Sequence, residues 1–286
     1  MAMIVKELLQ VGQKALEVAG IYDAKVDAEQ LLCYMLHVDK AGLFMIWSRM
    51  LDDRQCNTYF DLIDQRSTRL PLQHITGVQE FMGYPFLVND KVLIPRLDTE
   101  ILAEAAMDYS NNYKKKVHLL DLCCGSGAIG ISLDKICKNM KVTCSDISDD
   151  AVELAKKNAK QLKANVSFAI GDLFEPFKKK LGNTKFDLIV SNPPYIESEV
   201  IPTLEQEVRD HEPRLALDGG RDGLDYYRRI IEEAPSYLRE NGMVLFEIGY
   251  NQGKAIEELA ILKGPYVSVE IKKDHSGLDR VAICRT

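Results

Sequence analysis

The chain has 286 residues, of which 46 % are apolar and 28 % charged, and its formal net charge is −7. This length suffices for one large α/β domain with a small companion or for two ordinary domains. The negative net charge disfavours long nucleic acid as a partner, because binding to phosphates usually requires a basic surface. No apolar run approaches the roughly 18 residues that span a bilayer, and the N-terminus lacks a secretory pattern, so we expect a cytoplasmic protein with no membrane contact.

The first seventy residues predict a small bundle of short helices, because their apolar residues recur at helical spacing. The repeats are Ile4, Leu8, Val11, Ala15 and Val18; then Ala28, Leu31, Leu32, Met35 and Leu36; then Tyr59, Leu62 and Ile63, with Arg66 pointing outward. We expect residues 1–72 to form a helical domain that docks a substrate.

Residues 73–96 predict a β-hairpin that links two domains. Apolar or aromatic residues recur at Phe81, Tyr84, Phe86 and Val88, and a second apolar run extends from Val92 to Ile94. Between them lies Asn89-Asp90, a pair typical of tight turns. We therefore place the hairpin turn at Asn89-Asp90.

Residues 97–286 predict a second domain in which strands and helices alternate. Asp98 or Thr99 is placed to cap its first helix. Alternation of this kind indicates an α/β fold with a mainly parallel sheet and helices on both faces, where ligands bind at the carboxyl ends of the strands. The expected strands are 117–122, 142–145, 166–170, 186–190, 243–248 and 281–284, and the expected helices include 128–136, 151–162, 226–238 and 255–262.

The first of these strands runs directly into a glycine-rich turn. Gly125, Gly127 and Gly130 match the spacing Gly-x-Gly-x-x-Gly of dinucleotide sites. Glycine lets the backbone turn tightly and approach a ligand closely. On its own this pattern fits either a nucleotide or nucleoside site or a plain tight turn.

Carboxylates at the strand ends narrow the choice of ligand. Asp146 ends the second strand, where it can accept both ribose hydroxyl protons. Asp121, which ends the first strand, would repel a pyrophosphate but suits a ligand with an ammonium and a sulfonium, so it favours S-adenosylmethionine over NAD. The alternative for Asp121 is a helix-capping or solvated acid. Asp172 ends the third strand and could hold an adenine amino group, with Leu173 covering the ring.

The tetrapeptide Asn192-Pro193-Pro194-Tyr195 follows the fourth strand and is the most specific signal in the chain. Two prolines fix φ and remove two backbone donors, which leaves a rigid segment with free carbonyls. The side-chain oxygen of Asn192 and the carbonyl of Pro193 can accept both protons of an amide or amine NH2, and Tyr195 offers a flat face. Accepting both protons raises the electron density on a poorly nucleophilic nitrogen, so we expect methyl transfer to a planar nitrogen.

The metal-ligating residue types form no recognisable site. The seven cysteines include no Cys-x-x-Cys pair, and the five histidines are scattered along the chain. A zinc ribbon or a disulfide framework would show regular spacing. We therefore predict reduced, mostly buried thiols and no metal.

Along essentially its full length the chain resembles the PrmC/HemK family of protein-(glutamine-N5) methyltransferases. The resemblance rests on the helical N-terminal module, on Ile94–Glu100, on Asp121–Gly130, on Ser191–Tyr195, on Glu212-Pro213 with Ala216-Leu217, on Glu247–Gly249 with Gln252-Gly253, and on Asp279–Val281. It implies a Rossmann-like S-adenosylmethionine domain with a seven-stranded, mostly parallel sheet. It implies as substrate the glutamine of the Gly-Gly-Gln motif in class I peptide chain release factors, and we expect a monomer that makes no direct contact with nucleic acid.

The resemblance also implies residue roles. Cofactor contacts would come from Asp121, Cys123, Cys124, Gly125, Ser126, Gly127, Asp146, Asp172, Leu173 and Asn192. The catalytic residues would be Asn192, Pro193 and Tyr195, and the substrate contacts would be Asn192, Pro193, Pro194, Tyr195, Phe81 and Arg96. The chain departs from the family at two positions, with Cys123 in place of a glycine and Leu97 in place of a proline.

Four other functions compete with this one. The nearest is methylation of a glutamine in a large-subunit ribosomal protein, and the next is methylation of adenine N6 in nucleic acid, which would require a basic channel and base flipping. A regulator that binds the cofactor without catalysis could dispense with Asn192 and Tyr195. An NAD-dependent dehydrogenase would rest on the glycine spacing alone.

Overall fold

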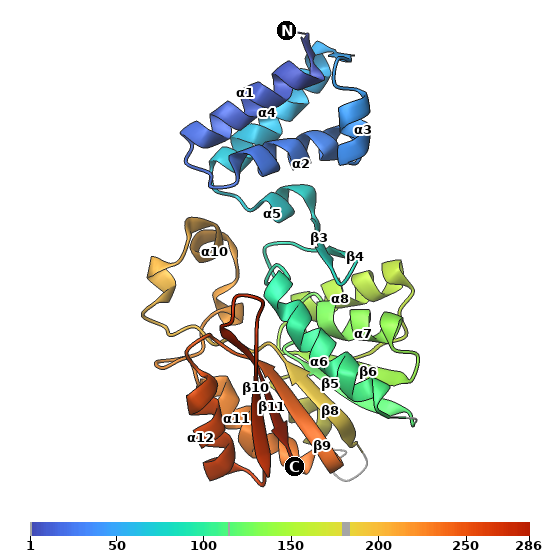
Figure 1. The fold of residues 1–286 in the computed structure, drawn as a ribbon, viewed down its shortest axis with the longest axis vertical. Coiled ribbons are helices and arrows are strands. Elements are labelled where there is room, and N and C mark those ends of the chain that lie inside the picture. Colours follow the sequence, from blue (N-terminus) through green and yellow to red (C-terminus); the bar gives the residue numbers. More distant parts are fainter. Residues whose placement is uncertain (1, 114, 179–183) are drawn as a thin grey trace. The chain divides into compact units, whose positions relative to one another are not determined.

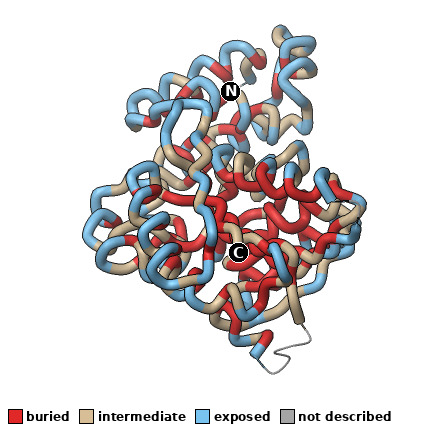
Figure 2. The backbone as a smooth tube through the Cα atoms, turned by 60° about the horizontal axis from the view of Figure 1, so that its bottom comes forward, coloured by how far each residue is buried: buried red, intermediate tan, exposed pale blue. Residues whose placement is uncertain are grey.

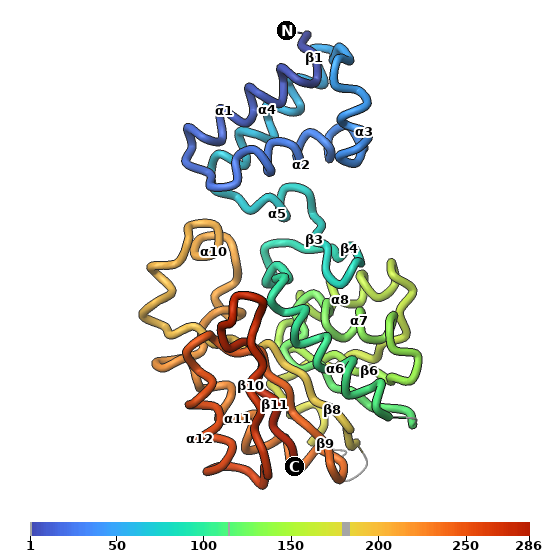
Figure 3. The backbone as a smooth tube through the Cα atoms, in the orientation of Figure 1, coloured from blue at the N-terminus to red at the C-terminus, as the bar shows by residue number. Residues whose placement is uncertain are grey.

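The chain folds into two compact units in a computed structural model that describes residues 2–113, 115–178 and 184–286 (Figure 1; Figure 3). The smaller unit comprises the residues up to Val78 together with Glu205–His211, and the larger unit comprises Gln79–Leu204 and Glu212–Thr286. No helix among the described residues combines the length and apolarity needed to cross a membrane.

The smaller unit is a helical bundle with one two-stranded antiparallel ribbon, β1 with β2. Its elements are β1 (Met3–Ile4), α1 (Val5–Val18), α2 (Ala24–Leu36), α3 (Lys40–Met45), β2 (Met50–Leu51), α4 (Asp53–Ser67), α5 (Leu72–Thr76) and α10 (Gln206–His211). Its core joins apolar residues of α1, α2 and α4. The last helix, α10, comes from a segment far along the chain, which the sequence pattern did not assign to this bundle.

Helix α1 buries a different face from the one that its apolar spacing predicted. Val11 and Val18 are exposed, and the buried positions include Leu8, Gly12 and Leu16. A Cβ at Gly12 would overlap the hydroxyl oxygen of Tyr59. The helix therefore turns its glycine inward so that the Tyr59 ring can pack close to the backbone, a contact that a count of apolar residues does not register.

The prediction that Arg66 points outward is wrong. Its side chain is 8 % exposed, and its Nε donates to Asp27 Oδ2 at 2.7 Å. Its Nη2 donates to Glu207 Oε1 at 3.0 Å, and its Nη1 donates to the carbonyl of Leu70. A buried guanidinium is tolerated because paired carboxylates replace its hydration. Since Glu207 lies on α10, this ion pair anchors that distant segment within the bundle.

The larger unit is built on a seven-stranded sheet with the order β10-β11-β9-β8-β5-β6-β7. Its strands are β5 (Val117–Leu122), β6 (Met140–Asp146), β7 (Ser167–Ile170), β8 (Phe186–Ser191), β9 (Leu238–Glu247), β10 (Ser268–Lys273) and β11 (Asp279–Arg285). Neighbours pair in parallel from β7 to β9, whereas β11 pairs antiparallel with both β9 and β10. The expected α/β fold with a seven-stranded, mostly parallel sheet is confirmed.

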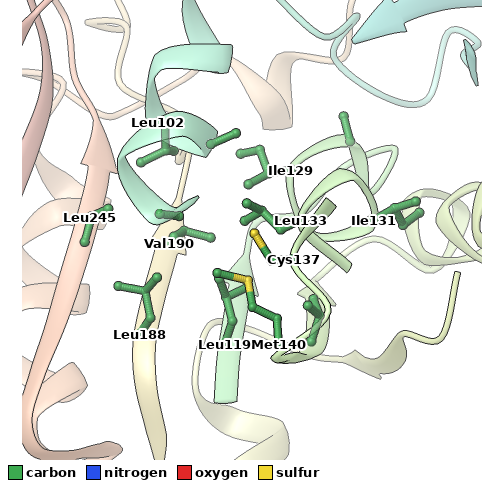
Figure 4. Packing of buried hydrophobic residues seen from close by; sticks show 14 of the residues in the cluster. Leu102, Leu119, Ile129, Ile131, Leu133, Cys137, Met140, Leu188, Val190 and Leu245 are labelled. Atoms are coloured by element: carbon green, nitrogen blue, oxygen red, sulfur yellow. The ribbon is translucent and has the colours of Figure 1, made fainter. Parts of the chain in front are cut away.

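Helices cover both faces of this sheet, and most of the buried apolar residues of the larger unit, drawn in red in Figure 2, belong to two cores. The helices are α6 (Glu100–Asn111), α7 (Ala128–Ile136), α8 (Asp149–Leu162), α9 (Glu175–Lys178), α11 (Asp225–Glu233) and α12 (Gly253–Lys263), with short 3-10 turns η1 (Leu97–Thr99), η2 (Ile201–Thr203), η3 (Arg214–Ala216) and η4 (Ala234–Ser236). On β5, Leu119 lies in the core that contains residues of α6 and α7 (Figure 4), and Leu120 lies in the core that contains residues of α11 and α12. This period of two is that of a strand buried on both faces.

Two details of the larger unit differ from the sequence prediction. The hairpin pairs β3 (Val78–Phe81) with β4 (Tyr84–Leu87), and its turn is Met82-Gly83 rather than Asn89-Asp90. Both turn residues have positive φ, which suits a two-residue hairpin loop. Strand β10 was not predicted, because it is an edge strand whose lysine and glutamate side chains leave no apolar run.

Candidate active site

An open pocket lies at the carboxyl ends of the parallel strands. The chain passes from β5 outward to β6 and β7 and then returns to β8 on the other side of β5. The crevice beyond β5 and β8 is therefore the point of reversal at which ligands bind in such sheets. The pocket holds about 850 Å³ of empty space, open solvent at its mouth included, and residues from 91–99, 123–129, 146–151, 192–194 and 213–216 line it together with Tyr226.

The glycine-rich turn leaves β5 with three residues in the left-handed region. Cys123, Gly125 and Gly127 have φ values of 58°, 53° and 79°. A Cβ on Gly127 would lie 2.7 Å from Ile131 Cδ1, so packing excludes a side chain there. A Cβ on Gly125 would meet nothing within 4 Å, since this residue faces the pocket. Glycine at these two positions lets the backbone line the pocket directly.

Asp146 at the end of β6 belongs to the pocket lining and shapes the turn. Its Oδ2 accepts a hydrogen bond from the Gly125 amide at 2.9 Å, and its Oδ1 accepts one from the Ser148 amide at 3.0 Å. Burial raises the pKa of Asp146, and these backbone donors oppose that shift. Each carboxylate oxygen keeps acceptor capacity for a ligand hydroxyl.

Asp121 lies beneath the turn rather than among the lining residues. It has no exposed surface, and its Oδ2 accepts from the Gly130 amide at 2.8 Å and from the Cys144 thiol at 3.8 Å. Its Oδ1 has no hydrogen-bond partner among the described residues, and burial raises the pKa of Asp121 to about 7. As placed, this carboxyl fixes the first turn of α7 against β5, and its predicted contact with a cofactor remains a prediction.

Asp172 and Leu173 follow β7 but do not reach the pocket lining. The Asp172 carboxylate pairs with the Arg229 guanidinium at 2.6 Å. Leu173 has a φ of 48° and turns into the core beside Phe174. Their predicted contacts with an adenine ring also remain predictions, because this structure gives both side chains other partners.

The Asn-Pro-Pro-Tyr segment brings Asn192 and Pro194 into the pocket lining beside the glycine-rich turn, because Leu122 and Ser191 are partners on neighbouring parallel strands. The Ser191 hydroxyl donates to the carbonyl of Leu122 at 2.9 Å and so ties the ends of β8 and β5 together. The Tyr195 hydroxyl donates to Glu247 Oε1 at 3.3 Å, and the Tyr195 carbonyl accepts from Gln252 Nε2 at 3.0 Å. Tyr195 and Pro193 are not among the residues that line the pocket. Hydrogen bonds to both side-chain and backbone atoms of the segment therefore hold it in place.

The two remaining predicted substrate residues have different environments. Arg96 lines the pocket, and its Nη2 donates to both oxygens of Glu212 at 2.7 and 2.8 Å. Phe81 is fully buried and packs edge-on against Phe86, with ring centroids 6.2 Å apart. The structure thus brings Arg96, but not Phe81, to the same pocket as Asn192.

Several lining residues escaped the sequence prediction. Ile147, half exposed beside Asp146, could have been found, because an exposed aliphatic residue directly after a strand-end acid is well placed to cover a ligand. For Tyr226, on α11, no motif in the neighbouring sequence indicates that its side chain lines a pocket. Thr99 was expected only as a helix cap, but it makes no capping bond, and its Oγ1 accepts from Asn192 Nδ2 at 3.3 Å.

Comparison with known proteins agrees with this geometry. Two family models match the chain: the methyltransferase small domain over residues 97–221 and the PrmC N-terminal domain over residues 7–77. A release factor glutamine methyltransferase of Clostridium acetobutylicum is 42 % identical over 264 residues, covering 90 % of each chain. One of Clostridium botulinum is 38 % identical over 288 residues, covering 99 % of each.

The solved structure of a methyltransferase from Pyrococcus furiosus is 20 % identical, with a TM-score of 0.51 over 71 % of this chain and 88 % of that one. That likeness shows the fold of the larger unit. The curated relatives carry the family assignment, because their identity extends over nearly the whole sequence. The chain belongs to the release factor glutamine methyltransferase family.

Proposed function

We propose that this chain transfers the methyl group of S-adenosylmethionine to the N5 amide nitrogen of the glutamine in the Gly-Gly-Gln motif of class I peptide chain release factors. One observation carries the proposal. Asn192 and Pro194 line the same pocket as Gly125 and Asp146, so an amide-binding wall and a nucleoside-binding wall enclose one space.

The residues on the nucleoside side suit S-adenosylmethionine. Asp146 presents a carboxylate to the pocket for ribose hydroxyls, and Ile147 presents an exposed aliphatic surface next to it. The backbone from Cys123 to Ser126 lines the pocket without a phosphate-binding lysine or arginine in that segment. When bound, the cofactor supplies an electrophilic methyl group on a sulfonium. We place Asp121, Gly127, Asp172 and Leu173 around this wall as supporting residues.

The residues on the amide side explain how a weak nucleophile reacts. The side-chain oxygen of Asn192 and the carbonyl of Pro193 accept the two NH2 protons of the glutamine, which raises electron density on its nitrogen and orients the lone pair. The nitrogen–carbon bond forms as the carbon–sulfur bond breaks, and the cationic amide then loses a proton to water. Burial raises the pKa of the Tyr195 hydroxyl, so it stays a neutral donor, and no strong base is required.

The partner is proposed to be a folded release factor, docked by the helical unit, with Arg96 beside the glutamine segment. Phe81, which is fully buried, would support that segment only through packing. The reaction needs neither a second subunit nor direct contact with nucleic acid, so we propose a monomer. Because release factors act in translation, we propose the cytoplasm as the place of action.

The test is methyl transfer from labelled S-adenosylmethionine to an intact class I release factor. The matched control is the same factor with the glutamine of its Gly-Gly-Gln motif changed to alanine. We expect label on the first and none on the second. Large-subunit ribosomal proteins and DNA serve as further acceptors in the same assay.

Two outcomes would overturn the proposal. Equal label on both release factors would place the reaction at another residue. Label on a ribosomal protein or on DNA, with none on the release factor, would assign the pocket to a different substrate.

A further inference from the structure

A buried carboxyl group stands directly behind the amide-binding wall. Glu247 is the last residue of β9, which lies beside β8 in the sheet (Figure 1), and only 2 % of its surface is exposed. The Tyr195 hydroxyl donates to its Oε1 at 3.3 Å. Its Oε2 has no well-aligned partner among the described residues. A buried carboxylate is costly unless donors surround it, so its place behind the catalytic segment calls for an explanation.

Thr99 connects this carboxyl to the pocket. Its hydroxyl is close enough to Glu247 to lower the pKa of that carboxyl by hydrogen bonding, against the larger opposing effect of burial. The same hydroxyl oxygen accepts from Asn192 Nδ2 at 3.3 Å, and Thr99 is 4 % exposed. A threonine hydroxyl has one hydrogen, which rotates toward the strongest acceptor, and two lone pairs.

The ionised carboxylate therefore sets the direction of each bond in the chain. A carboxylate only accepts, so both the Thr99 and the Tyr195 hydroxyls point their hydrogens at it. Thr99 is then left with lone pairs toward Asn192 and can only accept. Asn192 must turn its NH2 group toward Thr99, which leaves its carbonyl oxygen Oδ1 free to face the pocket.

We infer that Glu247 and Thr99 are positioning residues that fix which end of the Asn192 amide faces the acceptor nitrogen. The inference rests on the proposed function, since the orientation matters only if the Asn192 oxygen binds a substrate NH2. With the amide reversed, its NH2 would meet the substrate NH2, two donors would oppose each other, and the acceptor pair would be lost.

The other charges around Glu247 act on the same network. The Arg280 guanidinium favours the ionised carboxylate, and Asp98 disfavours it. Arg280 is itself held by Asp98 at 3.2 Å and by Asp274 at 3.0 Å. Burial raises the pKa of Glu247, so it protonates at a higher pH than an exposed glutamate. Once protonated, Glu247 can donate to Thr99 and allow the Asn192 amide to reverse.

Three substitutions test the network in the methyl-transfer assay. Thr99→Val keeps the shape of the side chain and removes the hydroxyl, and we expect kcat to fall by about tenfold or more with KM and cofactor affinity changed far less. Thr99→Ser retains the hydroxyl and should stay within about threefold of wild type. Ser110→Ala, the matched control, removes a buried hydroxyl at the other end of α6, where it bonds Asn139, and should leave kcat unchanged.

The pH profile separates positioning from simple packing. In wild type, kcat should fall as the pH drops through the raised pKa of Glu247. Glu247→Gln keeps the size of the side chain but cannot titrate, so it should lower kcat and lose this acid limb. An unchanged acid limb in Glu247→Gln would assign the limb to another group and contradict the inference.

A structural readout keeps this inference distinct from the proposed function. In a spectrum selectively labelled with 15N at asparagine, the NH2 pair missing from Asn192→Ala belongs to Asn192. Thr99→Val and Glu247→Gln should both shift that pair, and Thr99→Ser should barely move it. An unmoved pair in Thr99→Val overturns the positioning role even if the enzyme methylates release factors. Failure of wild type to methylate any release factor overturns the proposed function instead.

Discussion

The two walls of the pocket are held in place by different kinds of interaction. On the cofactor side, backbone amides of the glycine-rich turn donate to carboxylates at strand ends, as Gly125 does to Asp146 and Gly130 does to Asp121. On the acceptor side, side chains hold one another, through Asn192 with Thr99 and Tyr195 with Glu247. A wall built from backbone is fixed by local conformation, whereas a wall built from side chains depends on residues far apart in sequence.

The largest expected effect tests the acceptor side. Asn192→Ala removes one of the two acceptors that we propose for the substrate NH2, and we expect kcat to fall by about 10³-fold, the magnitude typical of removing a group aimed at the transition state. Cofactor affinity, measured by calorimetry, should change far less. Asn139→Ala serves as control, since that side chain bonds Ser110 away from the pocket. Normal turnover in Asn192→Ala would contradict the acceptor-pair mechanism.

The next effect tests the cofactor side. Asp146→Asn keeps one carbonyl oxygen but removes the charge that holds the Gly125 and Ser148 amides. A hydrogen bond to a charged group contributes about 1.5–3 kcal/mol, so affinity for S-adenosylmethionine should weaken about 10- to 100-fold. At saturating cofactor, kcat should change little. Asp134→Asn is the control, because that carboxylate also accepts a backbone amide, from Asn165, but outside the pocket lining.

The difference between the walls also explains what the sequence could reveal of the site. The glycine-rich turn and the Asn-Pro-Pro-Tyr segment are contiguous, so their residue types and order predict their conformation. Thr99 and Asn192 are 93 residues apart, and Tyr195 and Glu247 are 52 apart. Which distant residue a side chain contacts depends on the packing of the folded chain, which the local sequence does not show. For this reason Thr99 was predicted only as a helix cap.

The fold shows the same difference between features that depend on neighbouring residues and features that depend on distant ones. Strands buried on both faces, such as β5 and β8, were predicted nearly to the residue, because their apolar runs are continuous. Edge strand β10 was missed because solvent covers much of it and charged residues interrupt the pattern. Arg66 was predicted to point outward because no neighbouring residue in the sequence indicates that Glu207, on α10, would form an ion pair with it.

The stability of the cofactor side should depend on pH through Asp121. Burial raises the pKa of Asp121 to about 7, above the value of about 3.9 in an unfolded chain. The folded state therefore keeps a proton that the unfolded state loses, so this group stabilises the fold below about pH 4 and that contribution is lost as the pH rises to about 7.

Asp121→Asn cannot titrate in this window. The melting temperature of wild type relative to Asp121→Asn should therefore fall between about pH 4 and pH 7, by roughly 2–4 °C for each kcal/mol of burial cost. Thermal unfolding at a series of pH values measures the slope. Parallel curves for the two proteins would mean that Asp121 is ionised throughout the window and that the turn tolerates its charge.

The smallest expected effect concerns Cys123, which has a Cβ where the backbone has a φ of 58°. The left-handed region costs a residue with a Cβ about 1–2 kcal/mol, and Cys123→Gly removes that cost but loses about 1 kcal/mol through the greater conformational entropy of the unfolded chain. The net gain should be at most about 1 kcal/mol, a rise in melting temperature of roughly 2–4 °C. Cys123→Ala keeps the Cβ and loses the thiol, so it should show no such rise. If the alanine variant gains as much as the glycine variant, the thiol rather than the backbone conformation strains this turn.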